Sequence, residues 1–401
     1  MTGPLLPRRS ILLGAAALAG TARAQRIVDL HLPGGPSQRP TSSAWPQKGE
    51  MIVQRARPPL LETPFEVFGQ GVFTPNDRFF VRWHWGDIPT SIDAAAFRLN
   101  VRGHVARPLS LSLDELMAMP RIEYAAVNQC SGNSRGYFEP RVLGAQWGHG
   151  AMSNAKWTGV RLKDVLDRAG VQPGAVAVRF AGLDQPLVPD GPDFMKSLDL
   201  DHARDGEVMI AFLQNGEPLP LLNGFPLRVI VPGWFSTYWM KMLSDIEVLT
   251  APDDNFWMAK AYRIPDTPGA NVAPGAKGFA TKPISRMIPR SWITSHADGA
   301  RVTAGRPLPV RGIAMGGDAG VKSVALSVDG GRSWADASLG RDEGKYSFRR
   351  FEAVLPPPAA GALSLLPRCT STAGVTQSME PIWNGGGYLR GQVEPTRIMV
   401  A

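Results

Sequence analysis

The chain has 401 residues, of which 44% are hydrophobic and 19% charged, with a formal net charge of +8. These values are those of a globular protein long enough for more than one domain. Two cysteines exclude a disulfide framework, and the scattered basic residues do not indicate nucleic-acid binding.

Residues 1–24 have the pattern of a targeting segment. Arg8-Arg9 precede an apolar run over 10–20 that is too short to span a bilayer, and Ala22-Arg23-Ala24 offers a cleavage site. The paired arginines predict a twin-arginine signal peptide and a periplasmic protein. An ordinary secretory signal is the alternative. Cleavage after Ala24 lowers the net charge from +8 to +5. We expect no membrane span in the mature chain.

Residues 25–60 are rich in Pro, Gly and Ser and predict an extended arm. Residues 61–255 predict one α+β catalytic domain. Its expected helices cover 111–119, with Ser112 as N-cap and Glu115 at the capping-box position, and a segment from Leu162 that Gly170 closes. Its expected strands cover 79–84, 124–127, 176–180 and 225–233.

Residues 256–285 predict a connector rich in Pro and Gly, and residues 286–401 predict an all-β module. A strand over 321–328 is followed by Asp329-Gly330-Gly331, a strong hairpin signal, and residues 346–351 alternate in polarity. A compact β-sandwich fits this length.

Cys130 lies between the apolar stretch 124–127 and a turn over 131–136, so its thiol is expected at the end of a strand. A buried structural cysteine is the simplest interpretation. The segment 132–136 also reads G-x-S-x-G, the nucleophile elbow of serine hydrolases, but glycines and Pro140 follow where that motif needs a helix. The third interpretation is a thiolate metal ligand, with Arg135 close by to favour the thiolate.

Several motifs together resemble the sulfite oxidase family of molybdenum enzymes, from about residue 65 to the end of the chain. The resemblance is strongest to bacterial periplasmic sulfite dehydrogenases and to the related dehydrogenase subunit of the sulfur-oxidising system. The motifs are Phe79-Phe-Val-Arg-Trp-His84, Asn128-Gln-Cys-Ser-Gly-Asn-Ser-Arg135, Trp157-Thr-Gly-Val160, Asp201-His-Ala-Arg-Asp-Gly-Glu207, the stretch 225–241 and Trp257-Met-Ala-Lys-Ala-Tyr-Arg263.

This resemblance implies a molybdopterin-binding domain followed by an immunoglobulin-like dimerisation domain, with the Cys130 thiolate on molybdenum and one pterin dithiolene beside it. The implied catalytic residues are Arg82, Arg135, Trp147 and Tyr262. The implied cofactor-binding residues are Phe80, Arg82, His84, Cys130, Asp184, Asn223, Arg228, Trp239 and Lys241. Asn223 and Trp239 stand where vertebrate members have histidine, and a pocket arginine from the β module has no evident counterpart.

The implied reaction is oxidation of sulfite, a small sulfur oxyanion, to sulfate. Two arginines suit a dianionic substrate because forked guanidinium groups neutralise and orient oxyanions. The chain has no C-x-x-C-H motif and no fused haem domain, so we expect electrons to pass to an external c-type cytochrome. A homodimer, or a heteromer with a haem subunit, is expected. The alternatives are a sulfane-sulfur dehydrogenase of a thiosulfate-oxidising complex and the serine hydrolase.

Overall fold

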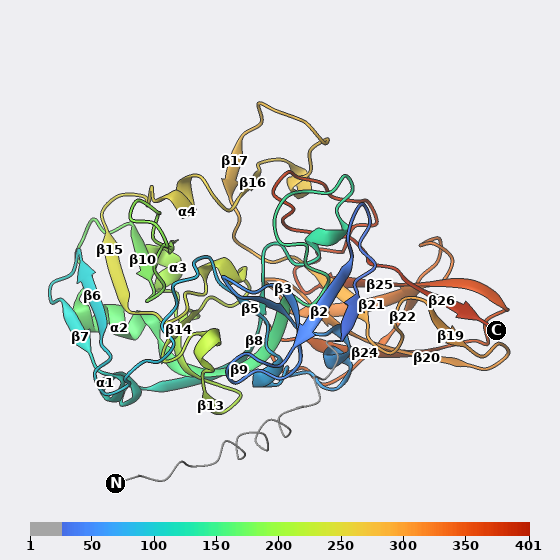
Figure 1. Cartoon of the computed structure of the whole chain (residues 1–401), viewed down its shortest axis with the longest axis horizontal. Helices are drawn as coiled ribbons and strands as arrows, with labels where there is room; N and C mark the ends of the chain where they lie inside the picture. The colour runs from blue at the N-terminus through green and yellow to red at the C-terminus, as the bar shows by residue number, and fades with distance from the viewer. Residues whose placement is uncertain (1–25) are drawn as a thin grey trace, which may run out of the picture.

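The computed structural model describes residues 26–401, so the expected signal peptide lies outside the described residues. The chain is rich in β-strands with a few short helices, and the C-terminal strands extend away from the rest as a separate lobe (Figure 1). The expected α+β fold with a C-terminal β-sandwich is confirmed. No helix within residues 26–401 is long and apolar enough to cross a membrane.

The segment expected as an extended arm is hydrogen-bonded into a five-stranded antiparallel sheet. Buried residues at Met51, Leu61 and Val81 hold this sheet on the catalytic domain. Its strands, in spatial order, are β1 (Ile27–Asp29), β2 (Gln38–Ser42), β3 (Met51–Arg55), β4 (Leu60–Glu62) and β5 (Val81–Arg82). The arm therefore forms part of the catalytic domain, because its Pro- and Gly-rich turns separate short strands that pair with one another.

Two further sheets form the centre of the catalytic domain. The first contains β11 (Met195–Asp199), β10 (Ala177–Ala181), β15 (Asp245–Leu249), β6 (Leu99–Gly103) and β7 (Leu109–Leu111). The second contains β13 (Glu217–Pro218), β12 (Met209–Gln214), β9 (Met152–Arg161) and β8 (Arg121–Gln129), with β14 (Arg228–Ile230) also paired to β12. The last five residues of β8 are buried, which matches the apolar run that predicted this strand.

The two expected helices form, although the first, α1, is shorter than the expected 111–119 because Leu111 belongs to strand β7 (Leu109–Leu111). Ser112 accepts a hydrogen bond from the Glu115 backbone N–H, and the Glu115 carboxylate accepts from the Ser112 N–H, so the capping box is confirmed. Gly170 ends its helix in the left-handed conformation, with φ +72°. The α-helices are α1 (Leu113–Met117), α2 (Leu162–Ala169), α3 (Leu200–Ala203) and α4 (Phe256–Ala259). The 3-10 helices are η1 (Phe65–Gly69), η2 (Asn76–Arg78), η3 (Arg135–Tyr137), η4 (Leu221–Asn223), η5 (Ser236–Tyr238) and η6 (Pro268–Ala270).

The connector carries a small hairpin, and the β-sandwich follows it. The hairpin consists of β16 (Arg263–Pro265) and β17 (Thr281–Pro283). One sheet of the sandwich contains β18 (Arg290–Ile293), β20 (Leu308–Met315), β24 (Arg349–Leu355) and β23 (Ser338–Leu339). The other contains β19 (Ala300–Val302), β26 (Thr396–Val400), β25 (Gly361–Ser371), β21 (Val321–Ser327) and β22 (Ala335–Asp336), so the hairpin expected at 329–331 is confirmed.

The sandwich has its own apolar core, and Cys369 belongs to it. Val310, Val324 and Leu365 are almost completely buried beside the Cys369 side chain. Burial raises the pKa of the Cys369 thiol to about 12, so this cysteine is a small hydrophobic residue at neutral pH.

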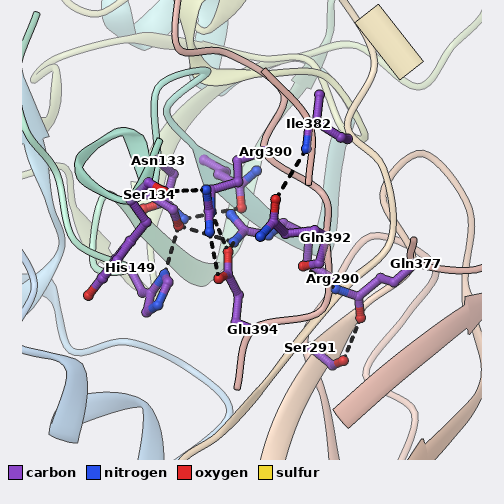
Figure 2. Close-up of polar contacts among 12 residues, drawn as sticks. Asn133, Ser134, His149, Arg290, Ser291, Gln377, Ile382, Arg390, Gln392 and Glu394 are labelled. Carbon is purple, nitrogen blue, oxygen red and sulfur yellow. Dashed lines mark hydrogen bonds and ion pairs between the residues drawn. The ribbon is translucent and has the colours of Figure 1, made fainter. Parts of the chain in front are cut away.

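A buried ionic network joins the β-sandwich to the catalytic domain (Figure 2). The Glu394 carboxylate accepts hydrogen bonds from Arg290 at 2.9 Å and from Arg390 at 2.8 and 3.2 Å. Arg290 also donates to the Ser134 hydroxyl at 3.0 Å, and that hydroxyl lies 2.7 Å from Nδ1 of His149. The loop that follows Cys130 is therefore held from the β-sandwich side by charged groups.

Candidate active site

Cys130 directly follows the last residue of β8, as the sequence predicts. Its N–H donates to the Ala151 carbonyl at 2.9 Å, and the residue is buried. The turn after it places Ser134 in the left-handed region, with φ +67°, before the single turn of η3. Two cavities meet at Cys130, because it lines both, together with Arg82, Ser131 and Tyr262. We call them the inner and the outer cavity.

The inner cavity has an empty volume of about 410 Å³ and is lined mainly by polar and cationic side chains. Arg82, the last residue of β5, and His84, two residues after it, both line this cavity. Of the predicted cofactor-binding residues, the cavity wall contains Phe80, Arg82, His84, Cys130, Asn223, Arg228 and Lys241.

Five buried polar atoms at this wall have no hydrogen-bond partner within residues 26–401. They are Nη1 of Arg82, Nδ1 of His84, Oγ of Ser131, Nε of Arg228 and Oγ1 of Thr237. Leaving such a group unpaired costs about 1–3 kcal/mol, so five around one cavity indicate a polar ligand. Because the two arginines donate and the two hydroxyls can donate, the ligand must present acceptor oxygens or nitrogens.

The charges around the inner cavity point to an anionic ligand. Burial, with the neighbouring Arg228 charge next, lowers the pKa of Lys241 to about 7. Burial likewise lowers the pKa of Arg228 to about 9. Lys48, which no sequence motif marks, donates to the Asn223 side chain and to the Phe79 carbonyl at 2.9 Å, and burial lowers its pKa to about 7. An anion between these groups would offset their mutual repulsion and favour their charged forms.

His84 and Tyr262 form a hydrogen-bonded pair where the two cavities meet. The Tyr262 hydroxyl lies 2.6 Å from Nε2 of His84, and the Arg82 guanidinium lies 5.9 Å from the centre of the Tyr262 ring. Burial, with the charge of Arg82 next, lowers the pKa of His84 well below its usual value, so the imidazole is neutral. Burial also raises the pKa of Tyr262, which keeps its hydroxyl protonated. When Tyr262 donates to Nε2, the His84 Nδ1–H is left to donate into the inner cavity.

The outer cavity is larger, with an empty volume of about 1200 Å³, and it is lined by four arginines. Arg82 and Arg135 were predicted, and Trp147 and Tyr262 complete the predicted catalytic set on its wall. Arg39 and Arg55 come from the N-terminal sheet and were missed. No Asp or Glu is among the described residues that line this cavity. Its surface therefore favours anions.

Arg135 is fixed by backbone carbonyls and by an aromatic ring from the β-sandwich domain. Its Nε and Nη2 donate to the Gly386 carbonyl at 3.2 and 3.1 Å, and its guanidinium lies 5.0 Å from the Tyr388 ring centre. A Cβ at Gly387, where φ is +58°, would come within 2.8 Å of the Arg135 side chain. The β module thus closes the cavity with a glycine turn and Tyr388.

Two predicted cofactor residues lie behind the inner cavity instead of lining it. Trp239 is buried, donates to the Trp234 carbonyl at 3.0 Å and packs edge-to-face on Trp157. Asp184 is buried close to Lys241; burial raises the pKa of the carboxyl, and attraction to Lys241 opposes this shift. Both support the cationic wall: Trp239 packs beneath Arg228, with 5.9 Å between ring centre and guanidinium, and Asp184 is the counter-charge of Lys241.

The serine of the G-x-S-x-G pattern lines neither cavity. Ser134 is fully buried, and its hydroxyl is bonded within the interdomain network to Arg290 and His149. The segment after it forms only η3, a three-residue turn, where a hydrolase elbow needs a helix. The hydrolase alternative therefore has no accessible nucleophile to support it.

Comparisons with known proteins agree with this geometry. Residues 85–257 match the family described as the oxidoreductase molybdopterin binding domain. Human mitochondrial sulfite oxidase is 34% identical over 355 residues, which cover 84% of this chain and 63% of that protein. The sulfite oxidase of Gallus gallus is 32% identical over 371 residues, covering 88% of this chain and 79% of that protein. The chain thus spans 63% of the length of the human relative.

Among solved structures, the sulfane dehydrogenase SoxCD from Paracoccus pantotrophus resembles the chain with a TM-score of 0.70. The match covers 84% of this chain and 83% of that one, at 24% sequence identity. At this identity the likeness shows that the two chains share a fold.

Proposed function

The chain belongs to the sulfite oxidase family of molybdenum enzymes, and from that premise we propose that it oxidises sulfite to sulfate and passes the electrons to an external c-type cytochrome. The observation that carries the proposal is the position of Cys130, where an inner cavity with unpaired donors meets an outer cavity lined by arginines. One cavity suits an anionic cofactor, and the other suits an anionic substrate.

The residues of the inner cavity fit a molybdopterin. Arg228 and Lys241 supply positive charge for the pterin phosphate, and the free donors of Arg82, Ser131 and Thr237 suit its oxygen and nitrogen acceptors. The Cys130 thiolate would ligate the molybdenum, since soft thiolates suit such centres. When bound, the molybdenum cofactor supplies the two-electron oxidation chemistry.

The chain's own residues bind and orient the substrate. Arg82 offers an unpaired guanidinium N–H, and Arg135, held by the Gly386 carbonyl, adds a fixed positive charge. The protonated Tyr262 hydroxyl lines the outer cavity, and its one proton can pass from the hydrogen bond with Nε2 of His84 to a hydrogen bond with a sulfite oxygen. Buried Trp147 forms a rigid wall that limits water at the reacting atoms. These groups offset the charge of the dianion close to the Cys130 thiolate.

Elemental analysis combined with a sulfite-dependent cytochrome c reduction assay tests this function. We expect about one molybdenum per chain and sulfite-dependent reduction. Protein with full molybdenum that does not turn over sulfite would contradict the proposal, and would favour the sulfane-sulfur dehydrogenase alternative, which has the same fold.

Arg82→Gln is expected to raise the KM for sulfite about ten- to a hundredfold, because a lost charge-assisted hydrogen bond costs about 1.5–3 kcal/mol. Rates should be normalised to molybdenum content, since Arg82 lines both cavities, and measured at constant ionic strength because salt screens the charge. Arg306→Gln, which removes an exposed charge in the β-sandwich, is the matched control. An unchanged KM in Arg82→Gln would remove this residue from the anion site.

We also propose that the protein is exported to the periplasm through Arg8-Arg9 and assembles through its β-sandwich, either as a homodimer or with a haem subunit. Replacing both arginines with lysine should abolish active enzyme in the periplasmic fraction, because the twin-arginine route exports folded, cofactor-loaded proteins. Cell fractionation measures this. Normal periplasmic activity in the double variant would contradict the export route.

A further inference from the structure

The outer cavity has more room than sulfite requires. Its empty volume, which includes space open to solvent, is about 1200 Å³, whereas an ion of four heavy atoms needs only two to three times the ~30 Å³ share of a water molecule. Two of its four arginines, Arg82 and Arg135, already suffice for one oxyanion beside Cys130. The other two, Arg39 and Arg55, lie on the same wall without an assigned role.

The register of the N-terminal sheet fixes where Arg55 lies. Arg55 of β3 pairs with Leu60 of β4, and Leu60 pairs with Arg82 of β5. Two interstrand spacings of ~4.8 Å place the Cα atoms of Arg55 and Arg82 about 10 Å apart on one face of the sheet. The two guanidinium groups therefore face the same outer cavity. Arg82 lies where this cavity meets the inner one, and Arg55 lies farther out.

A β-bulge turns consecutive side chains of β3 toward this cavity. The register shifts between Val53 and Arg55, so Gln54 is the extra residue, and both Gln54 and Arg55 line the wall. Bulges of this kind re-aim side chains next to active sites. Without the bulge, alternation would send one of the two residues to the opposite face.

Gln54 also positions Arg39. The Arg39 Nε donates to Gln54 at 3.0 Å, and Gln54 donates to the buried Glu62 carboxylate at 2.7 Å. Glu62 in turn accepts hydrogen bonds from the N–H groups of Gly148, which directly follows Trp147, and Gly150. Arg39 is thus tied through Gln54 to the loop that carries the cavity's tryptophan wall.

The Arg55 side chain, by contrast, is exposed at the cavity wall and has no hydrogen bond or ion pair to any residue in the described part of the chain. Partial burial, with the charge of Arg82 next, lowers its pKa, so the two like charges are near enough to repel each other. Because Arg55 lies near other arginines and has no carboxylate beside it, an anion bound in the outer cavity would be favoured at this position.

We propose that Arg39 and Arg55 form an outer anion subsite, so that the cavity takes sulfur compounds with two anionic groups. The first group, the sulfur oxyanion to be oxidised, lies at Arg82 and Arg135. The second lies several ångströms farther out, at Arg39 and Arg55. This inference rests on the proposed function and names its substrate class.

Binding of unreactive sulfonates to the holoenzyme, measured by calorimetry, tests the subsite. Butane-1,4-disulfonate should bind about ten- to a hundredfold tighter than butane-1-sulfonate, because its second sulfonate gains charge-assisted hydrogen bonds. Arg55→Gln should remove most of that preference and leave the affinity for the monosulfonate nearly unchanged. Arg306→Gln, an equal loss of charge far from the cavity, should keep the preference.

Equal affinity of the wild type for the two sulfonates would overturn the inference. An equal loss of affinity for both sulfonates in Arg55→Gln would also overturn the inference. That result would show that Arg55 attracts any anion through its charge and does not bind the second sulfonate. Sulfite turnover that persists without a disulfonate preference contradicts the subsite alone. A disulfonate preference in an enzyme that does not oxidise sulfite contradicts the proposed function alone.

Discussion

Replacing Cys130 with serine is expected to lower sulfite oxidation more than about a hundredfold, since changes in the outer shell of a metal site alone cost about 10–100-fold. A serine hydroxyl is protonated at neutral pH and is a poor substitute for a soft thiolate ligand. The two cavities that meet at this side chain would remain, because the backbone N–H of residue 130 still bonds to Ala151. The rate of cytochrome c reduction, molybdenum content and circular dichroism measure the three effects separately.

Cys369→Ser is the matched control, because the chain contains only these two cysteines. The Cys369 sulfur lies 3.5 Å from the Met315 carbonyl, which can accept a hydrogen bond from the new hydroxyl. We expect this variant to retain full activity per molybdenum. Wild-type turnover in Cys130→Ser would show that the thiolate is not a metal ligand.

Glu394→Gln is expected to lower the free energy of unfolding by about 3–5 kcal/mol, because it leaves buried cations without their counter-charge. Arg290 is 1% exposed and Arg390 is 9% exposed, and both donate to this carboxylate (Figure 2). Denaturant unfolding at pH 7 measures the difference. Asp266→Asn, which breaks a half-exposed ion pair with Lys282, is the control and should cost less than about 1 kcal/mol.

The effect of Glu394→Gln should depend on pH. The paired arginines lower the pKa of Glu394 from its ordinary 4.5 to about 2, despite the opposing effect of burial. A lowered carboxyl pKa contributes stability that is present above pH 4.5 and is lost as pH falls toward 2. The difference between wild type and variant should therefore shrink over that range. A difference that stays constant from pH 7 to pH 3 would contradict the assignment.

His149 adds an acid-sensitive contribution in both proteins. Burial lowers its pKa from 6.5 to about 3, so the unfolded chain binds a proton more readily than the folded chain. Stability should then fall as pH decreases below 6.5, whether or not Glu394 is present. Comparing the free energy of unfolding of the wild type with that of Glu394→Gln at each pH separates this shared loss of stability from the loss due to protonation of Glu394.

The sequence by itself determined the features that depend on neighbours along the chain. The capping box at Ser112 needs only a partner three residues away, and Gly170 ends its helix through its own backbone freedom. Arg82 and His84, two residues apart in the sequence, line the same cavity, as their spacing predicts. Cys130 falls at a strand end because an apolar run precedes it and a turn follows it. Local spacing is enough for all of these.

Only the tertiary structure decided which distant residues join the site. Tyr388 lies 258 positions from Cys130 in the sequence and reaches the outer cavity because the β-sandwich packs against the loop after β8. Arg55 faces the same cavity through a bulge that its sequence does not mark. Trp239 and Asp184 lie behind the inner cavity because packing places other side chains at its wall. Such placements depend on strand register and domain contacts, which join residues with no fixed spacing along the chain.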